Sequence, residues 1–132
     1  MATILIVEDN ETNMKLSSFL LESADHDVLK ATTAEAGVAI ARAAHPDLIL
    51  MDIQLPGMDG LQATALLKAD AATRDIPVVA LTALAMKGDE ERIRAAGCDG
   101  YIAKPLDYKS FLAEVKARLA APPTSGEIDR DA

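Results

Sequence analysis

Three carboxylates directly follow short apolar segments, a placement that could create a site for a cation and a phosphate. Glu8 and Asp9 come after residues 4–7, and Asp52 comes after residues 48–51. Mg²⁺ prefers oxygen ligands and often shares its site with a phosphate. A carboxylate can also attack phosphorus as a nucleophile and form an acyl phosphate. These acids therefore indicate a cation site in which one carboxylate accepts a phosphoryl group.

A hydroxyl and an ammonium stand at the ends of two later apolar segments. Thr82 follows residues 77–81, and Lys104 follows residues 101–103. An ammonium can neutralise charge on phosphoryl oxygens, and a hydroxyl can donate a hydrogen bond to them. Together with the acids, Thr82 and Lys104 would complete a site for phosphoryl transfer.

These residues meet only if the chain alternates strands and helices. The apolar patterns predict strands over 4–7, 27–31, 48–51, 77–81 and 101–103, and helices over 13–23, 34–44, 61–68, 86–96 and 108–119. Five such units favour a doubly wound α/β fold of the flavodoxin type, with a parallel sheet in the order 2-1-3-4-5. In that order the first and third strands are neighbours, so the three carboxylates should converge at the carboxyl ends of the strands.

The core is expected to be aliphatic, because 50% of the residues are hydrophobic but only 3% are aromatic. Helical spacing predicts these inward-facing residues: Leu16, Phe19 and Leu20 in the first helix, and Ala36, Ile40 and Ala43 in the second. The single cysteine, Cys98, excludes an intrachain disulfide and is expected to be a small apolar filler.

Charge and length narrow the class of protein. The net charge of -8 disfavours binding to nucleic acid or to an anionic membrane. Neither a signal peptide nor a run long enough to span a membrane is evident, so a soluble cytoplasmic protein is expected. The 132 residues fit one domain over 1–121, followed by a disordered acidic tail over 122–132.

Four motifs resemble the signatures of bacterial response-regulator receiver domains, which have the (βα)5 fold named after CheY. They are ILIVEDN at 4–10, MDIQLPGMDG at 51–60, ALTA at 80–83 and YIAKP at 101–105. A fifth stretch, MKGDEERIR at 86–94, is similar to the DivK type of single-domain cell-division regulator. The resemblance covers residues 3 to 120.

The resemblance implies a role for each matching residue. Asp52 would be the phosphoacceptor, and Mg²⁺, or Mn²⁺ in its place, would be held by Glu8, Asp9, Asp52 and the backbone carbonyl of Gln54. Thr82 and Lys104 would contact the phosphoryl group, with Ala83 as the small residue beside it. The Lys104–Pro105 bond would be cis.

The resemblance also implies a switch and its partners. Thr82 and Tyr101 would form the switch pair, although Tyr101 could also be an ordinary strand residue that packs on a helix. A sensor histidine kinase/phosphatase or a histidine phosphotransferase would dock around residues 13–17. A downstream kinase or adaptor protein would bind residues 87–94 and the outer face of the last helix of a monomer. Such a protein is a regulatory phosphoacceptor rather than an enzyme.

Two other functions compete with this interpretation. A phosphohydrolase of the haloacid dehalogenase type carries a second Asp two residues after its nucleophile, where this chain has Gln54. A flavodoxin-like cofactor module needs a loop rich in Gly, Ser and Thr after the first strand. Here that loop is acidic, from Glu8 to Glu11, and would repel a phosphate in the absence of a metal. Asp52 taken alone could also merely cap a turn.

Overall fold

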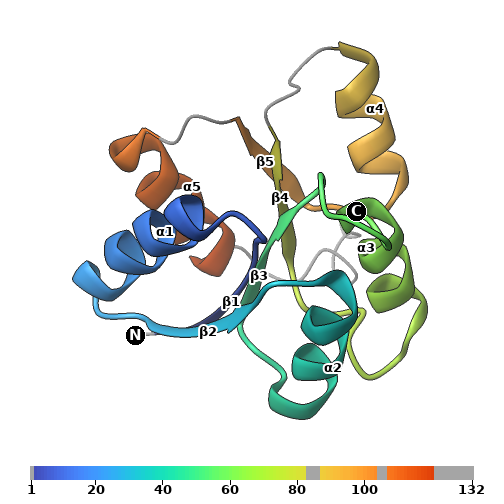
Figure 1. Cartoon of the computed structure of the whole chain (residues 1–132), viewed down its shortest axis with the longest axis horizontal. Coiled ribbons are helices and arrows are strands. Elements are labelled where there is room, and N and C mark those ends of the chain that lie inside the picture. Colours follow the sequence, from blue (N-terminus) through green and yellow to red (C-terminus); the bar gives the residue numbers. More distant parts are fainter. Residues whose placement is uncertain (1, 83–86, 104–106, 121–132) are drawn as a thin grey trace, which may run out of the picture.

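Strands form the middle layer and helices lie on both of its faces in the computed structural model, which describes residues 2–82, 87–103 and 107–120 (Figure 1). The strands are β1 (Thr3–Val7), β2 (Asp27–Ala31), β3 (Leu48–Asp52), β4 (Val78–Thr82) and β5 (Gly100–Ala103). The helices are α1 (Glu11–Ser23), α2 (Ala34–Ala44), α3 (Gly60–Ala69), α4 (Lys87–Ala95) and α5 (Tyr108–Ala120).

The sheet is parallel and has the order β2-β1-β3-β4-β5, which confirms the predicted topology. β1 and β3 are neighbours, with Val7 paired to Met51, and β3 pairs with β4 so that Asp52 lies opposite Leu81. Residues that follow β1 and β3 therefore emerge side by side at one edge of the sheet, as the sequence predicted.

Two apolar clusters fill the space on either side of the sheet. One lies beneath α1 and α5 and includes Leu21 and Phe111, and the other lies beneath α2, α3 and α4 and includes Val38, Leu67 and Ile93 (Figure 1). The central strands β3 and β4 are buried along their whole length, which suits their continuous apolar sequences.

The predicted inner face of α1 was partly wrong. Leu20 is buried, but Leu16 is 41% exposed and Phe19 is 67% exposed. The inward face carries Met14, Ser17, Ser18 and Leu21 in their place. Both sets of residues have helical spacing, so spacing alone did not separate the buried face of the helix from the exposed one.

The predicted inner face of α2 also needs correction. Ala36 and Ile40 pack partly buried against the core, but Ala43 is exposed, and Gly37 and Val38 are buried instead. A Cβ atom at Gly37 would lie 2.7 Å from Cγ2 of Val7, so α2 approaches β1 more closely than a larger residue allows. The small-residue face, rather than the aliphatic one, faces the strand.

The structure also bears on the predictions for the cysteine and for membrane-spanning segments. Cys98 is buried in the core, as expected of an apolar filler. Within the described part of the chain, none of the helices is both long enough and apolar enough to cross a membrane.

Candidate functional site

Glu8, Asp9 and Asp52 lie together at the carboxyl ends of β1 and β3. One carboxylate oxygen from each residue lies within 4.8 Å of the other two. Glu8 and Asp52 are buried, whereas Asp9 is exposed. The parallel pairing of β1 with β3 causes this convergence, because it places the residues after Val7 next to those after Met51.

Backbone amides donate the hydrogen bonds that hold the turn after β1. The amide of Glu8 donates to the carbonyl of Ala31 at 3.0 Å, which continues the pairing with β2. The amide of Asn10 donates to Oε2 of Glu8 at 3.2 Å, and Oδ1 of Asn10 accepts from the amide of Asn13 at 2.9 Å. Asn10 is therefore the N-cap of α1, and the two acids precede the helix rather than form its first turn.

The turn after β3 fixes the predicted phosphoacceptor. Oδ1 of Asp52 accepts a hydrogen bond from the amide of Gln54 at 3.0 Å. The amide of Ile53 donates to the carbonyl of Leu81 at 3.2 Å, so the strand pairing extends one residue beyond Asp52. Asp52 thus projects from a backbone that is hydrogen-bonded on both sides of it.

The chemistry of the three acids fits a hard divalent cation. Three carboxylates at this separation repel one another, and a cation between them would offset the repulsion. Oxygen ligands are those that Mg²⁺ prefers, and the exposed Asp9 leaves one side open for the waters that Mg²⁺ usually retains. Glu8, Asp9 and Asp52 are therefore the residues that would hold the ion.

Thr82 and Tyr101 lie on the adjacent strands. Thr82 ends β4, is completely buried, and stands one residue beyond Leu81, the partner of Asp52. Tyr101 of β5 pairs with Ala80 of β4. Its side chain is partly buried and packs against the core beneath α2, α3 and α4. The other predicted residues of the site, Lys104 with Pro105 and Ala83, lie outside the described residues.

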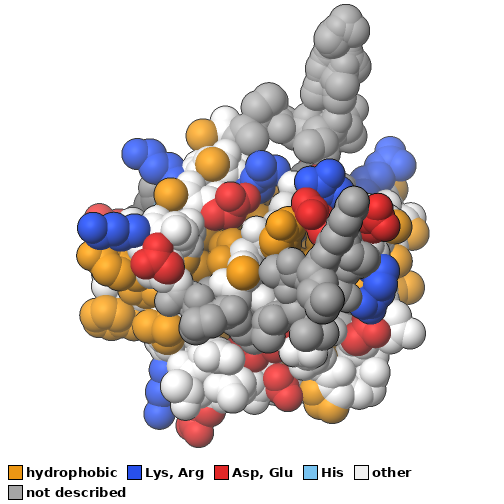
Figure 2. All heavy atoms as spheres, turned by 90° about the horizontal axis from the view of Figure 1, so that it is seen from above, with side chains coloured by type: hydrophobic (Ala, Val, Ile, Leu, Met, Phe, Trp, Pro, Cys, Tyr) orange, Lys and Arg blue, Asp and Glu red, His pale blue; other side chains and the backbone are white. Residues whose placement is uncertain are grey.

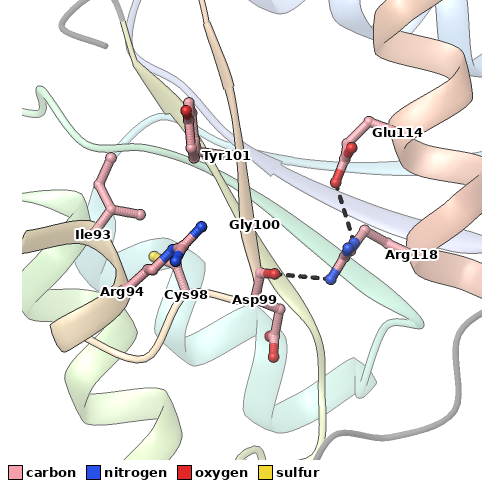
Figure 3. A pocket seen from close by; sticks show the side chains of 8 residues that line it. All are labelled: Ile93, Arg94, Cys98, Asp99, Gly100, Tyr101, Glu114 and Arg118. Atoms are coloured by element: carbon pink, nitrogen blue, oxygen red, sulfur yellow. Dashed lines mark hydrogen bonds and ion pairs between the residues drawn. The ribbon is translucent and has the colours of Figure 1, made fainter. Parts of the chain in front are cut away.

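A pocket opens beside Tyr101, between α4, β5 and α5 (Figure 3). Arg118 of α5 donates to the carbonyl of Asp99 at 2.8 Å and pairs with Glu114 at 3.1 Å. Arg94 and Cys98 line the opposite wall. Burial raises the pKa of the Cys98 thiol, so this cysteine is not an activated nucleophile. The pocket adds charged groups of both signs to the surface predicted for output.

Apolar side chains gather on one flank of the molecule. Figure 2 looks onto the carboxyl ends of the strands, and the apolar group lies at its left, on the side where Figure 1 has α1 and α5. The exposed large apolar residues of these two helices are Leu16, Phe19 and Tyr108. Sequence reasoning placed two of them in the core and so missed an exposed apolar surface on α1.

Sequence reasoning also missed how α3 begins. The helix was predicted from residue 61, but Gly60 is the first residue of α3 and Asp59 is its N-cap. Oδ1 of Asp59 accepts from the amide of Gln62 at 2.9 Å, and Oε1 of Gln62 accepts from the amide of Asp59 at 3.0 Å. The sequence signal was present, because an Asp followed three residues later by a Gln is a capping-box pattern.

Comparison with known proteins agrees with this geometry. The family model described as the response regulator receiver domain matches residues 4–116. The polar-differentiation response regulators DivK of Brucella ovis and Brucella suis are 50% identical over 117 residues, which cover 89% of this chain and 95% of each relative.

Solved structures give the same result. The receiver domain of sensor histidine kinase PA1611 from Pseudomonas aeruginosa, with a magnesium ion coordinated in its active site cleft, is 33% identical with a TM-score of 0.85. That match covers 91% of this chain and 98% of the other. Chemotaxis protein CheY4 of Vibrio cholerae shares the fold, at 24% identity and a TM-score of 0.84 over 89% of this chain and 98% of the other. The chain belongs to the response-regulator receiver family and is of the DivK type.

Proposed function

We propose that this receiver domain acts as a phosphoryl-accepting switch in two-component signalling, with Asp52 as the acceptor and Mg²⁺ as the required ion. The observation that carries the proposal is the group of three carboxylate oxygens within 4.8 Å, two of them on buried residues, at the carboxyl ends of adjacent strands. Such an arrangement is unfavourable by itself and becomes favourable when a cation binds.

Each residue has a defined task in the transfer. A carboxylate oxygen of Asp52 forms a bond to phosphorus while the bond from phosphorus to the donor histidine nitrogen breaks, and the histidine keeps that electron pair. The amide of Gln54 holds the acceptor carboxylate in place. Glu8 and Asp9 would bind the ion together with Asp52 and the carbonyl of Gln54, and Mn²⁺ would serve as a substitute. A bound Mg²⁺ supplies positive charge against the phosphoryl oxygens.

The remaining residues would respond to the phosphoryl group. The Thr82 hydroxyl and the Lys104 ammonium would contact its oxygens, and Ala83 would leave space beside it. Movement of Thr82 would allow Tyr101 to turn inward, which would change the pocket between α4, β5 and α5. A downstream kinase or adaptor protein must bind the two states unequally for this change to carry a signal.

The exposed apolar residues of α1 suit the phosphoryl donor. Leu16 and Phe19 present an apolar surface on α1, the helix that follows Glu8 and Asp9, and a helix of a sensor histidine kinase/phosphatase or of a histidine phosphotransferase would bury it. The Brucella relatives are named for polar differentiation, which supports a role for this protein in cell-cycle control. We place the protein in the cytoplasm as a monomer, with residues 1–121 as the signalling domain and 122–132 as an acidic tail, and as a regulatory phosphoacceptor rather than an enzyme.

The chemistry is tested with a small phosphodonor. The protein is incubated with acetyl phosphate and Mg²⁺, and the site of modification is located by mass spectrometry. Asp52→Asn should abolish labelling and keep the fold, because it preserves shape and removes the nucleophile. Asp25→Asn is the matched control, since Asp25 is exposed and has a φ of 68°, a conformation that Asn tolerates. Undiminished labelling of Asp52→Asn, or labelling in chelator, would refute the proposal.

The switch is tested separately. Beryllofluoride added with Mg²⁺ mimics the phosphoryl group on Asp52, and amide shifts are followed by NMR. Shifts should extend from Asp52 and Thr82 to Tyr101 and the walls of the pocket. Shifts confined to residues next to Asp52 would instead indicate a passive phosphate carrier.

A further inference from the structure

Gly60 lies against the backbone of the proposed phosphoacceptor. A Cβ atom at this position would lie 2.2 Å from the carbonyl oxygen of Asp52 and 2.7 Å from Cα of Ile53. Gly60 does not have the positive φ found at Gly57 and Gly97. A glycine is therefore required here because the first turn of α3 lies very close to the end of β3, and not because the backbone has an unusual conformation.

Hydrogen bonds hold this approach from both sides. The amide of Gly60 donates to the carbonyl of Ile53 at 3.3 Å, which closes the loop between them. The hydroxyl of Thr64, which is completely buried, donates to the carbonyl of Gly60 at 2.8 Å. The capping box of Asp59 and Gln62 fixes the same turn from the solvent side.

We infer that Gly60 and Thr64 are positioning residues for phosphoryl transfer, which set the place of the Asp52 carboxylate relative to Glu8 and Asp9. This inference rests on the proposed function of Asp52. The Gly60–Ile53 hydrogen bond closes a short segment that contains Gln54, the partner of the Asp52 carboxylate, and that directly follows Asp52. A shift of that segment moves one member of the acidic group, while the other two stay with β1.

The size of the shift follows from the contact. A methyl group 2.2 Å from a carbonyl oxygen requires the helix and the strand end to part by roughly 1 Å, a displacement that typically costs about 100-fold in rate at a reacting centre. The contacted atoms belong to the backbone, so no side-chain rotation relieves the contact. By contrast, a Cβ atom at Gly97 would lie 2.9 Å from Cγ of Lys68, a flexible side chain that can move away.

The first experiment compares Gly60→Ala with Gly97→Ala. Both variants are expected to lower stability, the second because Gly97 has a φ of 104°. Three quantities are measured: stability in urea, Mg²⁺ affinity from NMR titration, and the initial rate of labelling by acetyl phosphate at saturating Mg²⁺. Gly60→Ala should weaken Mg²⁺ binding by about 10- to 100-fold and shift the amide resonance of Gln54. Gly97→Ala, at the opposite edge of the sheet, should leave both unchanged.

The second pair adds no atoms and so keeps the fold. Thr64→Val removes the hydroxyl that holds the Gly60 carbonyl, and Thr73→Val removes an equally buried hydroxyl that donates to the Leu67 carbonyl at 2.8 Å, at the other end of the helix. Thr64→Val should weaken Mg²⁺ binding by less than about tenfold, and Thr73→Val should not weaken it. If Gly60→Ala does not fold, this pair of variants tests whether the first turn of α3 positions the Asp52 carboxylate.

The outcomes separate this inference from the proposed function. An unmodified protein that neither binds Mg²⁺ nor accepts a phosphoryl group would refute the function of Asp52 itself. An unmodified protein that is labelled, together with a folded Gly60→Ala that binds Mg²⁺ and is labelled equally well, would overturn the role of Gly60 alone. Equal effects of Thr64→Val and Thr73→Val on Mg²⁺ affinity would reduce Thr64 to a structural residue.

Discussion

The two edges of the sheet arrange charge in opposite ways. At the carboxyl ends of the strands, Glu8, Asp9 and Asp52 bring like charges within 4.8 Å. At the amino ends, Nζ of Lys68 lies 3.0 Å from Oδ2 of Asp99 and donates to the carbonyl of Ile76 at 2.8 Å. The same Asp99 oxygen accepts from the amide of Val78 at 2.8 Å.

This difference separates stability from function within one fold. The Lys68–Asp99 pair is largely buried and joins the end of α3, the start of β4 and the turn before β5, so it supports the framework. Three carboxylates as close as Glu8, Asp9 and Asp52 repel one another, which would oppose folding unless a positive charge offsets the repulsion. A local arrangement that costs stability is expected at a functional site, because binding of a ligand compensates for it.

Loss of the Lys68 ammonium should give the largest effect on stability. Lys68→Met would leave Asp99 buried without this partner, which should lower the free energy of unfolding by about 3 kcal/mol. Urea unfolding measures this change. Lys15→Met is the matched control, because Lys15 pairs with Glu11 at 3.8 Å on an exposed helix face and should matter by less than about 0.5 kcal/mol. Similar losses for both variants would contradict the comparison of the two edges.

Mg²⁺ should stabilise the carboxyl edge by a smaller amount. At ten times its dissociation constant the ion should raise the free energy of unfolding by about 1.4 kcal/mol, because it binds the folded state. Asp9→Asn should reduce that gain, yet it should be at least as stable as the unmodified protein in chelator, since it removes one repelling charge. Urea unfolding with Mg²⁺ and with chelator checks both. A destabilised Asp9→Asn in chelator would show that the acids do not repel in the folded state.

Ser17 tests stability at a buried position away from both the acidic group and the Lys68–Asp99 pair. Its buried hydroxyl has no hydrogen-bond partner among the described residues. Ser17→Ala removes that hydroxyl and improves helix propensity, so it should raise the free energy of unfolding by about 1 kcal/mol without changing Mg²⁺ affinity. The control is Ser23→Ala, whose exposed hydroxyl donates to the carbonyl of Phe19 at 2.8 Å and which should change stability by less than about 0.5 kcal/mol. A loss of stability on Ser17→Ala would point to a missed partner.

Asp70, at the end of α3, should give the smallest effect. The amide of Ala72 and, second, the Arg42 guanidinium hold the pKa of Asp70 below its ordinary value of 3.8. A pKa lowered by folding contributes stability above pH 3.8, and that contribution is lost as the pH falls through the folded-state pKa. NMR titration should show a midpoint below 3.8 that Arg42→Met raises only in part, because the Ala72 amide contributes most. A midpoint restored fully by Arg42→Met would give the guanidinium the larger role.

The positions of the strands and of the acids were predictable because both are local properties of the chain. Apolar runs such as residues 48–51 need a sheet covered on both faces, and a polar residue directly after such a run must emerge at its carboxyl end. Alternation of strands and helices then restricts the strand order to a few choices. The convergence of Glu8 and Asp9 with Asp52 followed from those two facts, while the roles of these residues in phosphoryl transfer, like those of Lys104 and Ala83, stay predictions.

Only the tertiary structure decided which of several helical faces is buried and which distant backbones touch. The faces of α1 with Phe19 and with Ser17 have the same periodicity, and only contact with α5 and the sheet selects between them. Lys68 against Asp99 is a contact between residues 31 positions apart, and the close approach of Gly60 to Asp52 depends on how α3 packs against the end of β3. Spacing specifies the direction of a side chain within its own element, but the separation between elements depends on how closely all of them pack.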